Sequence, residues 1–229
     1  MPETIIKHSL KTAITLLAFT LVGTFMLAYV FDITREPIEK SEAEARLALF
    51  RQILSDEKYY DDSDDEAHES DLLKNTIEIP SSDLLGNTAP TKAYIAKHHH
   101  KFDAVILEAV AHDGYSGDIK LLIAIRADGT VSGVRVLAHK ETPGLGDYID
   151  ITHGNWIKLF DNESVEKTPS EQWQVKKDGG KFDYMAGATI TPRAVVKAVF
   201  KALQFFEQNQ HMLRKAAEHK AEHEDKDES

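Results

Sequence analysis

The stretch DIKLLIAIRADGTVSGVRVLA, residues 118–138, decides the fold of this chain. In its first half an isoleucine or leucine recurs at every second position, at Ile119, Leu121, Ile123 and Ile125. This period-two pattern predicts a half-buried strand over Asp118–Arg126. Asp128-Gly129 is a tight-turn signal, and Val131–Leu137 follows as the returning strand. The stretch therefore predicts an antiparallel hairpin.

The flanking sequence adds one strand before the hairpin and helices after it. Ala104–Val110 is an apolar strand candidate, and Trp173 and Val175 suggest a further strand. Short helical turns are expected in Tyr148–Phe160. Thr191-Pro192 is typical of a helix start, and apolar residues follow it along one helical face at Val195, Ala198, Val199, Ala202, Leu203 and Phe206. The predicted fold class is α+β, a small antiparallel sheet with packing helices.

A membrane helix is predicted near the N-terminus. Thr12–Phe31 is a run of 20 residues without a charged side chain, and at about 1.5 Å per residue it spans roughly 30 Å, the hydrocarbon thickness of a bilayer. Lys7 and Lys11 cluster directly before the run, which favours a cytoplasmic N-terminus and an exported remainder. A cleaved signal peptide and a buried core helix are the alternatives. The length of the run and its apolarity on every face favour an uncleaved anchor.

The predicted organisation has five parts: a cytoplasmic N-terminus (1–11), a transmembrane helix (12–31), a membrane-proximal helix with an acidic linker (32–91), a globular domain (92–210) and a charged, disordered tail (211–229). The spacing of Ser41 and Glu44 is that of a capping box and predicts a new helix at Ser41. Most of the formal net charge of −11 lies in residues 56–71 and in the tail. The acidity therefore belongs to solvated segments.

Composition excludes several classes of function. The chain has no cysteine, which removes disulfides, thiol catalysis and cysteine-bound iron–sulfur clusters. No stripe of lysine and arginine is present, so nucleic-acid binding is not expected. The histidines of His98-His99-His100 and of the tail (His211, His219 and His223) lack accompanying ligands, so no metal site is predicted. Redox chemistry in this chain would need an organic cofactor or a histidine-bound metal.

Two loops have compositions that packing alone explains poorly. His139–Gly146, HKETPGLG, places two glycines around Leu145, so that backbone can approach a ligand while Leu145 is pushed outward. Asp183–Thr191, DYMAGATIT, leaves room around the hydroxyl of Thr189 shortly before a helix N-terminus, which suits a phosphate. From local physics, a tight connecting loop and a small-residue turn explain these segments equally well.

A resemblance makes the assignment specific. Residues 183–189, DYMAGAT, resemble the attachment pattern D-x-x-[S/T/A]-G-A-T of FMN-binding domains, and HKETPGLG resembles their second hallmark. The order and separation of the two motifs also match those domains, and so do Gly114–Gly117 before the alternating strand and Asn155–Ile157 after the loop. The continuation ATITPRAVVKAV is more similar to the G subunit of Rnf (also called Rsx) electron-transport complexes than to the C subunit of the sodium-translocating NADH:quinone reductase. The similarity covers the anchor and roughly residues 92–206.

The resemblance implies that the phosphate of FMN is esterified to Thr189 by a separate flavin transferase that uses FAD and a divalent metal. The recognition signal would be Asp183, Gly187, Ala188 and Thr189, and the loop facing the isoalloxazine ring would contribute Glu141, Thr142, Gly144 and Leu145. At the fourth position of the pattern this chain has Ala186, where Ser or Thr is common, so a hydroxyl beside the acceptor is absent.

The implied protein is an electron-carrier subunit, without substrate chemistry of its own. It would sit in the bacterial inner membrane with its FMN domain on the periplasmic side, and its partners would be the other subunits of the complex. That complex would couple electron transfer between ferredoxin and NAD, or a related carrier, to ion movement. A flavin-free assembly or binding subunit and a relative of the quinone-reductase C subunit remain as alternatives.

Overall fold

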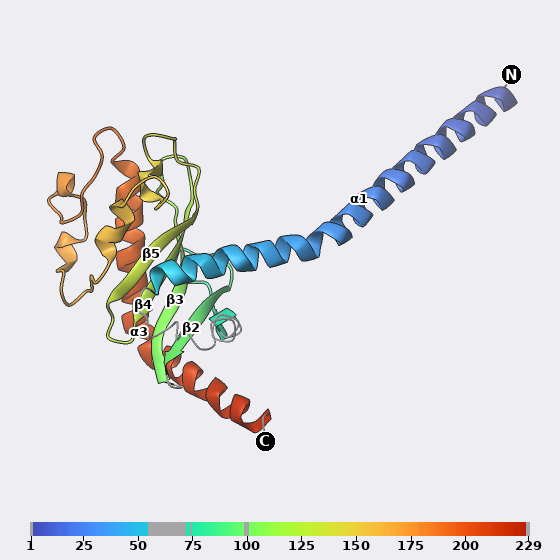
Figure 1. Ribbon diagram of the computed structural model, residues 1–229. Coiled ribbons are helices and arrows are strands. Elements are labelled where there is room, and N and C mark those ends of the chain that lie inside the picture. The colour runs from blue at the N-terminus through green and yellow to red at the C-terminus, as the bar shows by residue number, and fades with distance from the viewer. Residues whose placement is uncertain (1, 55–71, 74, 99–100, 228–229) are drawn as a thin grey trace. The chain divides into compact units, whose positions relative to one another are not determined.

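The computed structural model describes residues 2–54, 72–73, 75–98 and 101–227 (Figure 1). The chain forms two compact units, Met1–Arg46 and Leu47–Ser229. The acidic run 56–71 and His99 and His100 lie outside the described residues.

The first unit consists of most of helix α1, Pro2–Ile53. Its apolar side chains are exposed, and the helix is long and apolar enough to cross a membrane. The hydroxyls of Thr12, Thr15 and Thr20 donate to backbone carbonyls one turn earlier, which satisfies these polar groups inside an apolar segment. The prediction of a separate helix beginning at Ser41 is wrong, because α1 runs through Pro37 and Ser41 without interruption.

The second unit is built on a five-stranded antiparallel sheet in the order β1-β2-β3-β4-β5 (Figure 1). The strands are β1 Thr76–Ile79, β2 Thr91–His98, β3 Lys101–Ala111, β4 Ile119–Arg126 and β5 Val131–Ala138. The predicted hairpin is confirmed as β4 and β5, with Leu121 opposite Val136 and Ile123 opposite Val134. The predicted strand at Ala104–Val110 lies within β3.

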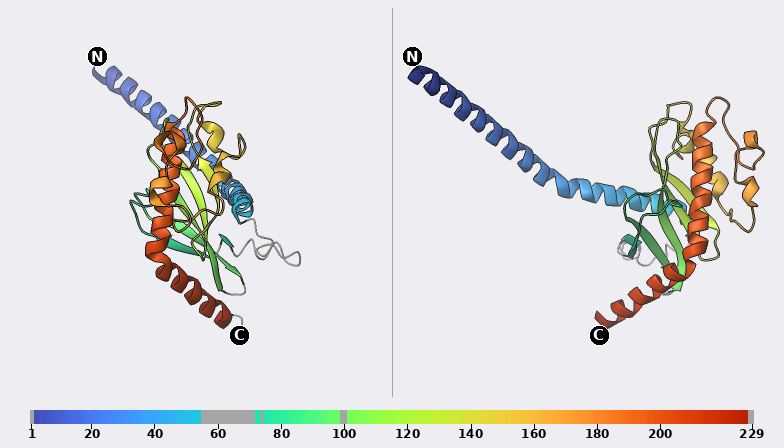
Figure 2. Two further views of the ribbon diagram at one scale, coloured as in Figure 1. Left: turned by 90° about the vertical axis from the view of Figure 1, so that its left-hand side faces the viewer. Right: turned by 180° about the vertical axis from the view of Figure 1, so that it is seen from behind.

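Both faces of this sheet are covered. Helix α3, Ile190–Asp227, crosses one face (Figure 2), where Leu121 and Ile123 are buried in the larger core. On the opposite face Phe50, Ile53 and Leu54 cover Leu122 and Ala124. The strand predicted over Asp118–Arg126 is confirmed as β4, but the prediction that only one of its faces is buried is wrong. The end of α1 also buries Leu122 and Ala124, which point to the face opposite α3, and this burial explains why these two positions are apolar.

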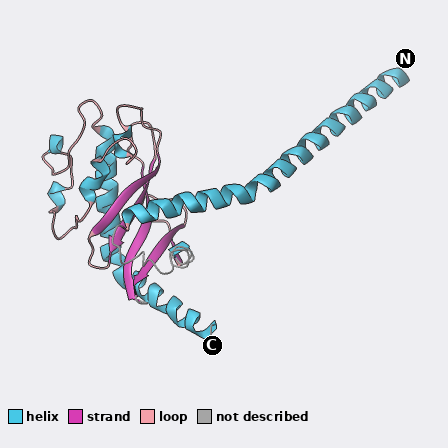
Figure 3. Ribbon diagram, viewed as in Figure 1, coloured by secondary structure: helices cyan, strands magenta, loops and turns pink. Residues whose placement is uncertain are grey.

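The connection between β5 and α3 contains loops and short helical turns (Figure 3). The turns are η2 Asp147–Ile149, η3 Trp156–Phe160, η4 Ser170–Gln172 and η5 Lys176–Asp178. The helical turns predicted within Tyr148–Phe160 are confirmed. The strand predicted around Trp173 and Val175 is wrong, because Val175 makes only an isolated bridge to Phe182. Trp173 instead packs against Phe160, Phe182 and Phe200.

Helix α3 is longer than predicted. It continues to Asp227, so that residues 211–227 are helical, within the segment for which the sequence predicts a disordered tail. Leu213 and Ala217 are buried in the same core as Phe206, so the apolar face of the helix extends past residue 210. Nor does residue 92 mark the start of the packed unit, since β1 and residues 47–54 also belong to it.

Candidate functional site

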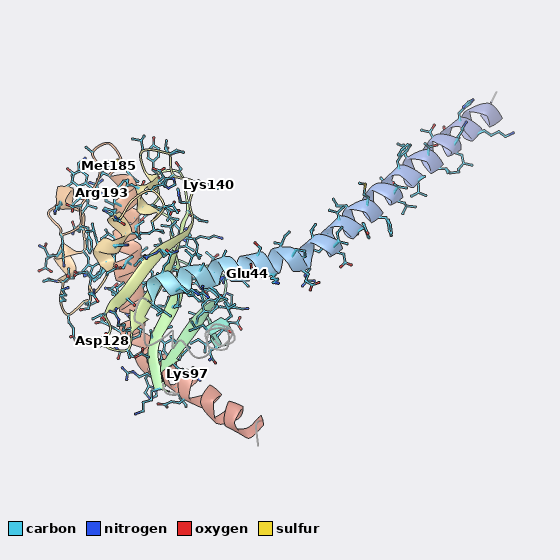
Figure 4. The ribbon with its side chains drawn as sticks, in the orientation of Figure 1. Glu44, Lys97, Asp128, Lys140, Met185 and Arg193 are labelled. Carbon is cyan, nitrogen blue, oxygen red and sulfur yellow. The ribbon has the colours of Figure 1, made fainter. Side chains whose placement is uncertain are left out.

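Three segments far apart in the sequence meet at one end of the second unit: the turn 114–117, the loop 139–146 and the segment 183–191, which runs into α3. Lys140 and Met185, from two of these segments, lie toward the same end, away from Asp128 and Lys97 (Figure 4). Glu141 accepts hydrogen bonds from the backbone N–H of Ser116 and from the hydroxyl of Thr191. The structure therefore joins the segments that the sequence singled out.

Thr189 directly precedes Ile190, the first residue of α3, and so occupies the N-cap position. Its backbone carbonyl accepts from the N–H of Arg193, one turn into the helix. An N-cap threonine normally accepts a hydrogen bond from the N–H of the second or third helical residue. Here the third is Pro192, which has no N–H. The sequence thus removes one of the two donors that would occupy the Thr189 hydroxyl.

The Thr189 hydroxyl is consequently available. Among the described residues it forms no side-chain hydrogen bond, and it is not one of the fully buried unpaired polar atoms, so its oxygen contacts solvent. The residue as a whole is only 8% exposed. A buried side chain with an accessible oxygen has few rotamers to lose, which favours a covalent acceptor at a fixed place.

The turn before Thr189 depends on glycine. Gly187 has a φ of 90°, which an L side chain rarely adopts, and nothing lies within 4 Å of where its Cβ would stand. The N–H of Ala188 bonds to the carbonyl of Met185 and closes the turn at 3.1 Å. Gly187 therefore supplies the bend and leaves open space beside the acceptor.

Two aromatic side chains hold the backbone of this segment. The phenol oxygen of Tyr148 accepts from the N–H of Met185 at 3.2 Å, and the indole N–H of Trp156 donates to the carbonyl of Asp183 at 2.7 Å. The two rings pack edge to face with centroids 5.7 Å apart. Burial raises the pKa of Tyr148 above its ordinary value, so the phenol stays neutral near pH 7. Sequence reasoning missed Tyr148, whose only signal is its place directly after the glycine-rich loop.

The loop 139–146 has the conformation that its composition predicts. Gly144 has a φ of 74°, and the N–H groups of Leu145 and Gly146 both bond to the carbonyl of Thr142. Leu145 is 47% exposed, which confirms that its side chain is directed outward. Thr142 and Gly144 are also exposed. These three residues can contact a ligand at the surface.

Glu141 differs from the other loop residues. The family resemblance places it among residues that face the isoalloxazine ring, but its side chain points inward and the residue is 5% exposed. One carboxylate oxygen accepts from Ser116 and the other from Thr191. Hydrogen-bond donors inside the domain satisfy the carboxylate, so Glu141 lies beneath the exposed part of the loop.

Asp183 lies at the surface and pairs with Lys176 at 2.5 Å, both side chains being more than half exposed. Next to it, Tyr184, Met185 and Ile190 are large apolar side chains that remain exposed. Leu145 contributes a fourth from the other loop. An exposed apolar group next to an available hydroxyl is the composition expected of a cofactor site.

Comparisons with known proteins match this site. A family model described as "FMN-binding domain" covers residues 114–204, and one described as "RnfG N-terminal region" covers residues 1–53. A protein from Pseudomonas aeruginosa, named as the G subunit of an ion-translocating oxidoreductase complex, is 43% identical over 218 residues, 95% of this chain and 97% of its own length. This chain belongs to that G-subunit family.

Other proteins of the same name agree. The one from Vibrio cholerae is 40% identical over 203 residues, and the one from Shewanella baltica is 41% identical over 201 residues. The chain covers 92% and 91% of their lengths. The match to the FMN-binding domain contains every segment of the site, from the turn at Gly114 to the first turns of α3. This member of the G-subunit family therefore carries an FMN-binding domain after its N-terminal helix.

Within the described residues, no group of three or more histidine, aspartate or glutamate side chains could hold a metal ion. Both ring nitrogens of His112 form hydrogen bonds, Nδ1 with Asp118 at 2.8 Å and Nε2 with the carbonyl of Gly86 at 2.7 Å. These contacts raise the pKa of His112, the hydrogen bond to Asp118 being the largest cause.

Proposed function

We propose that this chain is the FMN-carrying electron-transfer subunit of an ion-translocating oxidoreductase complex, with the FMN phosphate esterified to Oγ1 of Thr189. The observation that carries the proposal is the Thr189 hydroxyl, which has no hydrogen-bond partner among the described residues and stands at the head of α3. Membership of the G-subunit family and the FMN-binding domain support the choice of cofactor.

The residues around Thr189 fit a phosphate and a flavin ring. Ile190 and Thr191 begin α3, so their N–H groups have no partner within the helix, and the positive end of the helix dipole favours an anion there. The open space at Gly187 gives room for the phosphate. Leu145 and Met185 offer exposed apolar surface to an aromatic ring.

Attachment needs an enzyme, because a threonine hydroxyl is a weak nucleophile. In the proposed step a flavin transferase forms a bond between Oγ1 of Thr189 and the phosphorus of the FMN half of FAD. The phosphoanhydride bond to AMP breaks, AMP leaves, and the hydroxyl proton passes to a base of the transferase. A divalent metal would neutralise the phosphates during this transfer. The side chain of Asp183 is exposed, and the transferase would recognise it together with Gly187 and Ala188.

Bound FMN supplies reversible electron transfer, and the protein determines where this happens. Thr189 tethers the cofactor, Tyr148 and Trp156 fix the backbone that carries it, and Thr142, Gly144 and Leu145 form the opposing surface. The subunit would exchange electrons with the other subunits of its complex, between a carrier such as ferredoxin and NAD. It would not transform a substrate by itself.

The proposed location is the bacterial inner membrane. Residues 12–31 of α1 would cross the bilayer once, residues 1–11 would remain in the cytoplasm, and the FMN domain would lie on the periplasmic side. The apolar, exposed α1 and the lysines that precede its apolar run support this topology. The match of residues 1–53 to the RnfG N-terminal region favours the Rnf complex over the sodium-translocating quinone reductase as the assembly that contains this chain.

The test is the covalent flavin itself. The full-length chain is coexpressed with a flavin transferase and separated on a denaturing gel, and its intact mass is measured. We expect in-gel flavin fluorescence and the mass increment of one FMN phosphoester, both lost in Thr189→Val. Thr189→Ser keeps a hydroxyl and serves as the matched control that retains some attachment. A loaded Thr189→Val chain would move the site elsewhere, and an unloaded native chain would favour the flavin-free assembly subunit.

A further inference from the structure

The buried carboxylate of Glu141 lies at the junction of the three site segments. Its Oε1 accepts from the backbone N–H of Ser116 at 3.1 Å, and its Oε2 accepts from Oγ1 of Thr191 at 2.6 Å. The partners lie 25 and 50 residues away along the chain. One side chain therefore joins the turn 114–117 and the loop 139–146 to the first turn of α3.

Two glycines keep the space for this carboxylate. A Cβ on Gly114 would lie 2.9 Å from Oε1 of Glu141 and even closer to the carbonyl oxygen of Gly117. A Cβ on Gly146 would lie 2.7 Å from Oε2 and 2.8 Å from Oγ1 of Thr191. Neither glycine has a positive φ, so close packing, and not backbone freedom, requires them. The chain thus encloses Glu141 from two sides.

The hydrogen bond between Glu141 and Thr191 also affects Thr189, because the two threonines are close in the chain. Thr191 lies two residues after Thr189, in the same first turn of α3. A hydrogen bond that fixes Thr191 also fixes the direction in which the N-cap residue presents its hydroxyl. Because Pro192 follows, that turn has fewer backbone donors with which to hold itself in place.

We propose that Glu141 is a positioning residue for flavin attachment, which holds Thr189 in place through Thr191. This inference rests on the proposed function, since it assumes that Thr189 is the acceptor. The competing explanation is that Glu141 and Thr191 stabilise the core and have no particular effect on attachment.

The domain contains a matched control for that competing explanation. Thr168 is 2% exposed and donates its hydroxyl to the buried carboxylate of Glu163 at 2.5 Å. Thr168→Val removes a buried threonine–glutamate hydrogen bond, and also a contact from Lys181 at 3.2 Å, between residues outside the three site segments. Thr191→Val likewise replaces one hydroxyl by a methyl group, and it removes the hydrogen bond to Glu141 at the site. Thr191→Ser keeps the hydroxyl.

The experiment measures the rate of attachment to purified, unloaded full-length chain, incubated with flavin transferase, FAD and Mg²⁺ well below its unfolding temperature. We expect Thr191→Val to load about tenfold more slowly than the native chain, the factor that loss of one buried hydrogen bond gives. Thr191→Ser should restore most of the rate, and Thr168→Val should lower the unfolding temperature without slowing attachment.

The outcomes separate the two proposals. If the native chain takes no flavin, or takes it at a residue other than Thr189, the proposed function fails. If the native chain loads on Thr189 and Thr191→Val loads equally fast, or if Thr168→Val slows loading as much, the positioning role of Glu141 is overturned while the proposed function stands.

Discussion

The charge of Glu141 has an effect separate from its hydrogen bonds. In the described part of the chain no lysine, arginine or histidine forms an ion pair with it, so hydrogen bonds alone compensate the buried carboxylate. Glu141→Gln can keep both contacts, since the amide oxygen can accept from Ser116 and the amide nitrogen can donate to Thr191. The substitution therefore removes the charge and leaves the geometry.

We expect Glu141→Gln to load FMN and to have a more positive midpoint potential than the native chain, because a nearby buried negative charge disfavours addition of an electron. The shift should be tens of millivolts, since about 1.4 kcal/mol corresponds to ~59 mV for one electron. Redox titration of the flavin absorbance measures it. Glu163→Gln, at a buried carboxylate outside the site, should shift the potential less. An unchanged potential in a fully loaded Glu141→Gln would contradict the expected electrostatic effect.

At this scale the sequence predicts residue types better than side-chain directions. The outward direction of Leu145 follows from the glycines on either side of it, because the local backbone determines it. The inward direction of Glu141 depends on donors 25 and 50 residues away, which no local pattern contains. The role of Tyr148 could not be predicted for the same reason, because its hydrogen-bond partner Met185 lies 37 residues further along the chain.

At the scale of elements, the contact between the end of α1 and β5 is close enough to be tested. A Cβ on Gly133 would lie 2.9 Å from the Cα of Ile53, which is backbone and cannot move aside cheaply. Arg135, two residues later, reinforces the contact by donating to the side chain and the carbonyl of Gln52 at 3.0 and 2.9 Å. This part of α1 therefore packs directly on the sheet.

We expect Gly133→Ala to lower the free energy of unfolding by about 1–3 kcal/mol, the usual cost of overpacking a core. Thermal or urea unfolding followed by circular dichroism measures the change. Gly154→Ala is the control, because its Cβ would stand 3.3 Å from the nearest atom, the carbonyl oxygen of Tyr148, and should cost less. Equal stability of Gly133→Ala and the native chain would mean that the helix end and the strand separate easily.

Elements with a strong periodic signal were predicted, and those that depend on long-range packing were not. The β4–β5 hairpin follows from the alternation. Thr191-Pro192 predicts the helix but not its first residue, since α3 begins at Ile190, two residues before Pro192. The strand predicted at Trp173 and Val175 is replaced by turns, because an aromatic cluster and the contacts of Lys181 with Glu163 and Thr168 organise that segment. The capping-box spacing at Ser41 did not start a helix, since α1 already included those residues.

At the scale of the whole molecule, the two compact units divide at Arg46 and Leu47, well after the predicted membrane run. The side chains of residues 7–35 are exposed, whereas Phe50, Ile53 and Leu54 are completely buried against the sheet. The globular unit thus includes the last turns of the helix that carries the anchor. The sequence could not predict this, because the apolar positions of 47–54 alone do not indicate which surface they cover.

A chain that begins at Leu47 should therefore be soluble without detergent, unfold cooperatively and accept FMN on Thr189 from the transferase, because it keeps both cores and the site. A chain that begins at Leu72 lacks Phe50, Ile53 and Leu54 and exposes Tyr94, Ile106 and Leu122. Loss of three buried side chains at about 1.5–3 kcal/mol each approaches the whole stability of a domain, so we expect this shorter chain to aggregate or to unfold at a much lower temperature. Comparison of the two by calorimetry and in-gel fluorescence tests the boundary. Equal unfolding temperatures would show that the end of α1 covers the sheet without stabilising it, and the domain would then begin after the acidic run.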